Sequence, residues 1–567
     1  MDTNNLQDFI LSPDTVPLIV YTDILTPAFL ADNPNIQLGK SFPGGYTIIY
    51  TDRAYAEQVI DLIYSASHNL LPLIFGLMGE AELTASGITQ VQQHPALDLR
   101  GHGVLLGFID TGIDYTQNAF RYEDGSSKIA AIWDQTMRGR PPEGYHYGSE
   151  YSNNDINAAL LSDNPQELVP HQDTAGHGTF LASVAGSREP GTYIGAAPDA
   201  EIIAVKLKRA QPYVCEYFLV PPELKDVYAT DDIMMGVQYI LDTARKLGRP
   251  VAICLGLGSN IGSHNGFTAL EEYLSNIAGI PGTAMCVAAG NESQSGHHTM
   301  GRLGNTGDTQ DIDLRVGTAA QDIYLSIWNY AVDRLSVSIR TPTGLQIARI
   351  PARSDETFTQ RLPLERSMVS VTYQFPIQRS GEQLTRIKIW SATQGVWRIT
   401  VHGDVVLDGT YHAWLPVTAL SPPNIQFLSP VPNYTVTAPA TAVGVITCGA
   451  YDSRSGALSP TSSWGPTRLP AIAPDLVAPG VDVTGIFPYG HGTMGGTSVA
   501  AAITAGACAL MLQWGVVEGH DASYDSFRIR AKLIAGCDRT AGLAYPNNQW
   551  GFGRLNLMAT FEGLRPV

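Results

Sequence analysis

The stretch GVLLGFIDTGID (residues 103–114) has the pattern of a buried strand that ends in an acid and a glycine turn. Residues 103–110 are almost continuously apolar, as in a parallel strand covered on both faces. In open α/β sheets, functional groups gather at the carboxyl ends of such strands. Asp110 is therefore a candidate site residue, although an Asp that caps a turn would give the same local pattern.

Strand and helix patterns alternate on both sides of this stretch, over residues 81–296. We expect apolar strands at 200–207, 251–257 and 283–289, and a helix with an apolar stripe at 231–247. This βαβ alternation predicts an α/β fold with a doubly wound parallel sheet and helices on both faces. The same character returns over residues 441–567.

Two segments depart from this alternation. Residues 1–80 predict a small α+β unit with strands at 16–21 and 46–50 and a helix at 52–66, which could be a separate binding domain or a prodomain. Residues 297–440 have period-2 segments separated by turns, typical of an all-β sandwich of the jelly-roll kind. The β unit is thus inserted within the α/β domain.

Composition narrows the class of protein. Hydrophobic residues make up 44% of the 567 residues, which indicates a globular chain, and the net charge of -18 argues against nucleic acid and anionic membranes as partners. No apolar run of about 18–20 residues is seen. The polar first residues lack the features of a secretory signal, so export by that route is not expected.

Metal and disulfide chemistry have no sequence signal. The six cysteines are scattered without a CxxC pair, and we expect small buried thiols. There is no zinc-type spacing and no dense carboxylate loop of the kind that binds calcium, so no metal and no cofactor are expected.

Three further candidate residues lie in glycine-flanked motifs. His177 lies in GHGT (176–179) where a helix is expected to begin, Ser498 in GGTSVAAA (495–502) at the start of a small-residue helix, and Asn291 just after the strand VAAG (287–290). A hydroxyl at a helix N-terminus and an amide beyond a strand can both serve an oxyanion. Taken singly, each could be a structural His, an ordinary N-cap Ser or a turn Asn.

Together the motifs form a pattern. The order Asp110, His177, Ser498 is one of the orders in which a Ser-His-Asp triad occurs. With FIDTGID, GHGT, AAGNE and GTSVA, and with GAAP (195–198) and APDLVAPG (473–480), the chain resembles the subtilisin-like serine proteases, the subtilases. One departure is Ala502, where subtilases usually have Pro. A second HGT string at His491 lacks the apolar helix that follows His177, and we assign it a loop role.

A closer resemblance is to the Csp-type germination proteases of spore-forming Firmicutes. It rests on the long β insertion and on the stretches ASGITQV (85–91) and AIWDQT (131–136). The resemblance implies an inserted jelly roll and a prodomain that self-cleaves and stays bound. Together with the absence of secretory-signal features, it implies a cytoplasmic or spore-associated location. The apolar segment 72–79 is the expected cleavage region, with a cut between about Phe75 and Glu82, after Leu77, Met78 or Gly79.

The resemblance also implies roles for the site residues. Asp110 would orient His177, His177 would take the proton of Ser498, and Asn291 with the Ser498 backbone N–H would bind the oxyanion. A peptide or protein substrate would pair with the strand segment 254–258 as an added strand. The substrate-binding residues expected are Leu255, Gly256, Leu257, Gly258, Ala288, Ala289 and Gly290.

Two other functions stay open at this point. The chain could be a pseudoprotease-like scaffold that presents the β insertion, although all three triad residues are present. It could also bind carbohydrate through a platform of aromatic side chains, for which the candidates are Trp328, Trp390, Trp397 and Trp414.

Overall fold

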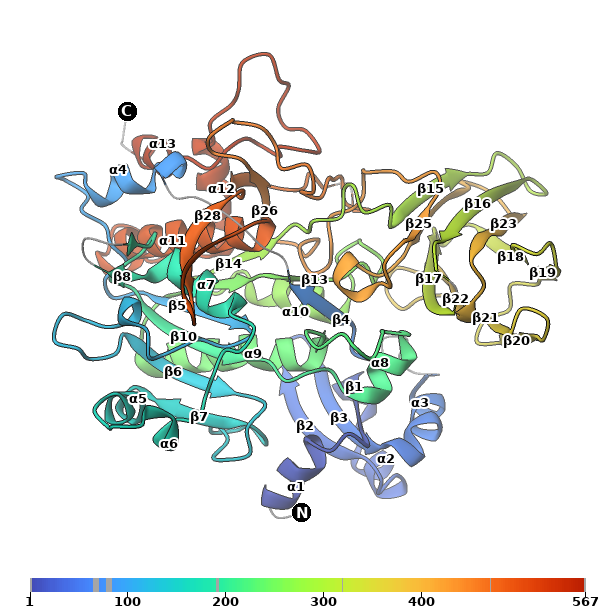
Figure 1. Cartoon of the computed structure of the whole chain (residues 1–567), viewed down its shortest axis with the longest axis horizontal. Coiled ribbons are helices and arrows are strands. Elements are labelled where there is room, and N and C mark those ends of the chain that lie inside the picture. The colour runs from blue at the N-terminus through green and yellow to red at the C-terminus, as the bar shows by residue number, and fades with distance from the viewer. Residues whose placement is uncertain are drawn as a thin grey trace.

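The computed structural model describes residues 3–64, 71–77, 84–189, 193–318, 320–469 and 471–564. Its centre is an eight-stranded sheet in the order β27-β26-β14-β12-β5-β10-β6-β7 (Figure 1). All neighbouring strands are parallel except the edge strand β7. The strands are β5 Leu105–Asp110, β6 Ile129–Asp134, β7 Ser149–Ser152, β10 Glu201–Lys206, β12 Val251–Leu255, β14 Thr283–Ala288, β26 Ile446–Tyr451 and β27 Leu476–Pro479.

Helices cover both faces of this sheet, as predicted. On one face Leu106 and Phe108 of β5 pack in an apolar cluster with helices α7 (His177–Gly186) and α11 (Thr497–Leu512). On the other face, Leu105 and Ile109 pack with α9 (Thr230–Leu247) and α10 (Ala269–Ile277). Apolar residues on both faces of β5 explain its nearly continuous hydrophobic sequence.

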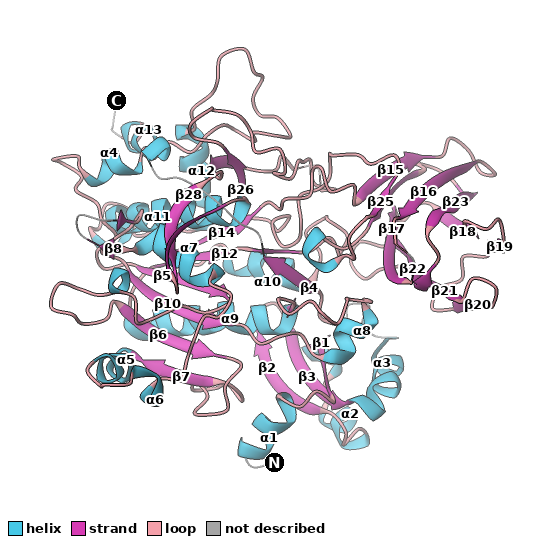
Figure 2. Ribbon diagram, viewed as in Figure 1, coloured by secondary structure: helices cyan, strands magenta, loops and turns pink. Residues whose placement is uncertain are grey.

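Further helices and two-stranded pairs surround this core (Figure 2). They are α4 Ile88–Gln92, α5 Asn153–Leu160, α6 Pro165–Leu168, α8 Pro212–Tyr217, α12 Ser526–Gly536 and α13 Leu557–Glu562, with the two-stranded pairs β8 Arg188–Glu189 and β9 Tyr193–Ile194, and β28 Val483–Phe487 and β29 Gly490–Met494.

The N-terminal unit, residues 3–64, has a three-stranded antiparallel sheet in the order β1-β3-β2. One face of this sheet packs on α3, and the other face packs on α9 and α10 of the central domain. Phe42 meets Tyr273 edge to face, with ring centroids 5.3 Å apart. The elements are α1 Thr3–Ile10, β1 Thr15–Tyr21, α2 Pro27–Asp32, β2 Gln37–Phe42, β3 Tyr46–Asp52 and α3 Ala56–Tyr64.

A short strand, β4 (Ile74–Leu77), follows the N-terminal unit and lies in the middle of a three-stranded sheet of its own. It pairs antiparallel with β11 (Tyr228–Ala229) on one side and with β13 (Leu257–Gly258) on the other. Figure 1 shows β4 between the central domain and the β unit.

The inserted unit is a sandwich of two antiparallel sheets, in the orders β15-β24-β17-β22-β21-β20 and β19-β18-β23-β16-β25. Its own apolar cluster fills the space between the two sheets. The strands are β15 His298–Arg302, β16 Thr309–Val316, β17 Gln321–Asn329, β18 Arg334–Arg340, β19 Gln346–Ile350, β20 Thr357–Leu362, β21 Ser367–Gln374, β22 Gln383–Ala392, β23 Gly395–Val405, β24 Thr410–Trp414 and β25 Ile425–Phe427.

One helical segment of the described chain, Thr497–Val517, is long and apolar enough to cross a membrane. It comprises α11 and a π-helical turn, Gln513–Val517. The expectation that no segment reaches this length was therefore wrong. Because 89% of its most apolar stretch is buried inside the protein, the segment is the central helix of a core.

Candidate active site

Three side chains from distant parts of the chain form a hydrogen-bonded series at the carboxyl end of strand β5 in the central sheet. Asp110 is the last residue of β5, His177 is the first residue of α7, and Ser498 is the second residue of α11. His177 Nδ1 lies 2.8 and 2.9 Å from the two carboxylate oxygens of Asp110, and His177 Nε2 lies 3.1 Å from Ser498 Oγ. The three side chains are buried. The acid therefore fixes the imidazole so that Nε2 can accept the serine proton.

The turn before α7 is held by an acid that the sequence reasoning missed. Asp173 is buried and accepts hydrogen bonds from Gly176 N at 2.8 Å, from Thr179 N at 2.9 Å and from Thr179 Oγ1 at 2.7 Å. Gly176 has φ +83°, a conformation that favours glycine. Asp173 thus satisfies orphan N–H groups at the helix start and sets the position of His177.

Asn291 is hydrogen-bonded to Thr497, the residue directly before Ser498. Asn291 Oδ1 accepts from Thr497 N at 3.1 Å, so its amide NH₂ is turned away from Thr497 and can donate elsewhere. The N-cap residue of α11, Gly496, has no side chain to cap the helix, and the N–H groups that follow Thr497 in the first turn have no intrahelical partner. The amide and the helix N-terminus can therefore act on the same negative charge.

The predicted strand 251–257 is interrupted at Gly256, between β12 and β13. A Cβ at this position would lie 2.9 Å from Ser498 Cβ and 3.2 Å from His177 Cε1, which is too close for a larger residue to fit without a shift of the site. The chain therefore passes directly behind the Ser–His pair and continues as β13. There Leu257 pairs with Leu77, and Gly258 pairs with Gly76.

Most of the other expected substrate-binding residues are buried in the core of the central domain. Leu255 and Leu257 are each 1% exposed and belong to the apolar cluster shared with α9 and the N-terminal unit. Ala288 and Ala289 are fully buried. Gly290 has φ +108°, and a Cβ there would lie 2.7 Å from Thr437 Cγ2. In the structure as it stands, the bound strand meets the backbone of β13.

Two sequence interpretations change with the structure. His491 lies on strand β29 and not in a loop; its side chain is 45% exposed, with Nε2 3.3 Å from Glu189 Oε2. The proposed aromatic platform is not formed, because Trp328, Trp397 and Trp414 are buried. Trp414 stacks on His264, with ring centroids 4.2 Å apart. All six cysteines are free and buried, as expected.

A buried charge cluster lies at the start of α9, beneath the N-terminal unit. Asp232 binds Lys208 Nζ at 2.6 Å and accepts from Tyr147 OH at 2.5 Å. The adjacent Asp231 is fully buried. Burial, together with the negative charge of Asp232, raises the pKa of Asp231 to about 7. The pKa of Tyr50, on β3 of the N-terminal unit, is raised by burial and by these two acids.

Comparison with known proteins agrees with this geometry. The model of the subtilase family, Peptidase_S8, matches residues 101–313 and 372–553, which is well over half of the chain. Among solved structures, the CspB protease of Clostridium perfringens is 32% identical with a TM-score of 0.75; the match covers 85% of this chain and 99% of that one.

Curated relatives are similar over smaller parts of their length. The PII-type proteinase of Lactococcus lactis subsp. cremoris is 27% identical over 271 residues, which are 44% of this chain and 12% of that proteinase. The C5a peptidase of Streptococcus pyogenes serotype M6 is 22% identical over 450 residues, 73% of this chain and 34% of the peptidase. The chain thus spans about a third or less of these relatives.

Proposed function

Because the chain belongs to the subtilase family, a family of serine proteases, we propose that it is an endopeptidase whose catalytic triad is Asp110, His177 and Ser498. The observation that carries the proposal is the buried series of hydrogen bonds from Asp110 through His177 to Ser498 Oγ. Asn291 and the Ser498 backbone N–H are proposed as the oxyanion donors.

The reaction follows from these positions. Ser498 Oγ attacks the carbonyl carbon of the scissile bond while His177 Nε2 takes its proton, and Asp110 stabilises the resulting imidazolium. Negative charge develops on the carbonyl oxygen, near the Asn291 amide and the N-terminus of α11. The imidazolium then gives its proton to the leaving amine. Water repeats the sequence on the acyl-enzyme and frees the acid.

We further propose that the N-terminal unit is a prodomain that stays bound after self-cleavage. Its sheet packs on α9 and α10, and polar contacts surround this apolar interface. Lys40 Nζ lies 3.3 Å from Asp242 Oδ2, Gln211 Nε2 donates to Ile10 O at 2.8 Å, and Arg138 pairs with Asp8 at 2.6 Å. An interface with an apolar core and a polar rim is typical of stable association.

The direction of β4 supports cleavage directly after it. Its last residue, Leu77, pairs with Leu257, the neighbour of Gly256, and Gly256 lies against Ser498. The chain is thus bound as an added strand that leads toward the nucleophile. We propose one cut after Leu77, Met78 or Gly79. Positions 78–83 lie outside the described residues.

A serine-directed fluorophosphonate probe and intact-mass measurement test both proposals. The wild-type chain should be labelled at Ser498 and found as two fragments that elute together on gel filtration. Ser498→Ala should be folded, unlabelled and uncut. A folded wild type that is neither labelled nor cut would instead favour the scaffold function, and a cut that persists in Ser498→Ala would refute self-processing.

A further inference from the structure

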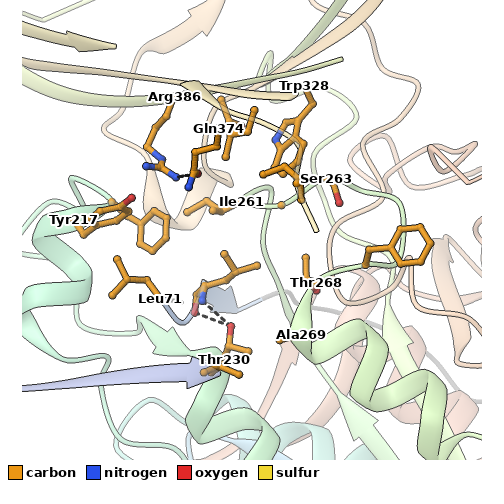
Figure 3. Close-up of a pocket in the computed structure, with 18 of the residues that line it drawn as sticks. Leu71, Tyr217, Thr230, Ile261, Ser263, Thr268, Ala269, Trp328, Gln374 and Arg386 are labelled. Carbon is orange, nitrogen blue, oxygen red and sulfur yellow. Dashed lines mark hydrogen bonds between the residues drawn. The ribbon is translucent and has the colours of Figure 1, made fainter. Parts of the chain in front are cut away.

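A cavity of about 120 Å³ lies where the N-terminal unit, the central domain and the inserted unit meet. Leu71 and Leu73, just before β4, line it together with Ile261 and Ala269 of the central domain. Figure 3 shows Leu71, Ile261 and Ala269 around the cavity. The cavity is therefore the upstream continuation of the groove that holds β4.

Backbone contacts continue from β4 into this cavity. Leu73 N donates to Thr230 Oγ1 at 2.7 Å, and Thr230 N donates to Leu73 O at 2.9 Å; the side chain of Thr230 is drawn at the base of Figure 3. These bonds hold the main chain whatever its sequence. Side-chain selection at position 73 must therefore come from the cavity walls.

The inserted unit supplies a large part of those walls. Tyr324, Ser326 and Trp328 alternate along β17 and point out of the sandwich, while Leu325 between them belongs to its inner core. Leu384 and Arg386 of β22 line the cavity in the same way. The lining is mainly apolar, with a polar edge at which Arg386 donates to Gln374.

We infer that the inserted unit completes a substrate subsite that takes an apolar side chain five to seven residues before the scissile bond. This inference rests on the proposed peptidase function. In the self-cleaved protein Leu73 lies along this cavity and helps to hold the inhibitory tail in the groove. In a substrate protein the occupant is a Leu, Ile or Phe at the matching position. The open space beside Leu71 and Leu73 allows a larger side chain there.

The rate of fluorophosphonate labelling of the self-cleaved chain tests this inference, because the bound tail shields Ser498. Leu73→Ala should speed labelling roughly tenfold, since burial of a leucine side chain is worth about that factor or more in affinity. Leu384→Ala should also speed labelling. The double variant should gain less than the product of the two effects, because both residues line the same cavity. Leu73→Phe should label no faster than the wild type.

Leu325→Ala is the matched control, since it removes the same side chain from the neighbouring strand but on the inner face of the sandwich. It should label at the wild-type rate. Equal rates for wild type, Leu73→Ala and Leu384→Ala would overturn the subsite while leaving the peptidase function intact. No labelling in any of these folded proteins would refute the peptidase function, and the subsite with it.

Synthetic peptides give the second test. The Leu73→Ala protein, with its weakened tail, is supplied with a peptide of residues 69–84 that has Leu or Ser at position 73. We expect kcat/KM for the Leu peptide to be roughly tenfold higher. Hydrolysis of both peptides at one rate would show that the cavity does not select substrate.

Discussion

Replacement of Asp173 by Ala tests how the position of His177 is set. The change removes one buried carboxylate and leaves three donors, two on Thr179 and one on Gly176, without their acceptor. A hydrogen bond to a charged group contributes about 1.5–3 kcal/mol, and these three share one acceptor and are not additive. We therefore expect a loss of roughly 3 kcal/mol or more in the free energy of unfolding. Movement of His177 by about 1 Å should lower kcat about 100-fold.

The assay is peptide hydrolysis beside thermal unfolding, with Asp173→Asn as an intermediate case. Asn keeps one acceptor oxygen, so its kcat should fall between those of the wild type and the Ala variant. Asp163→Ala, an exposed acid ten residues earlier, is the control and should change stability by no more than about 0.5 kcal/mol. If folded Asp173→Ala keeps kcat within about threefold of wild type, Asp173 does not position His177.

Three further outcomes are expected. His491→Ala should keep most of the peptidase activity and folded His177→Ala should lose it. Equal losses in the two variants would contradict the assignment of His177, and not His491, as the residue that takes the Ser498 proton. Gly290→Ala should lower kcat about 100-fold, because a side chain at φ +108° displaces Asn291 from the oxyanion, and unchanged kcat would contradict that role for Asn291. Asp231 has its pKa raised from 3.8 to about 7, so the folded state favours its neutral form and stability should fall as pH rises from about 4 to 7. Asp231→Asn should raise the Tm at pH 8 but not at pH 4, and equal shifts at both pH values would rule out this linkage.

The sequence predicts the elements of the site well because each candidate lies at the end of a strongly patterned segment. The strand that ends at Asp110 and the helices that begin at His177 and near Ser498 all have uniform apolar or small-residue patterns with glycines beside them. Such patterns arise when an element is buried, and burial at the centre of a sheet leaves little choice of residue.

The residues that hold the site in place were not predictable in the same way. Asp173 lies in a loop, and its partners are identified only when α7 folds beside it. Thr230 looks like any residue at the start of a helix until Leu73 is found beside it. Gly256 lies close to Ser498, which is far from it in the chain, and no local pattern encodes that approach.

The separation of His177 and Ser498 by 321 residues has a consequence for biosynthesis. At translation rates of about 5–20 residues per second, the histidine is incorporated roughly 15–60 s before the nucleophile. The whole inserted sandwich is translated in that interval and can fold while the chain is still inert. Under the proposed function, peptidase activity therefore arises only at the last stage of synthesis. A nascent chain that ends before residue 498 lacks the proposed nucleophile and should be inactive.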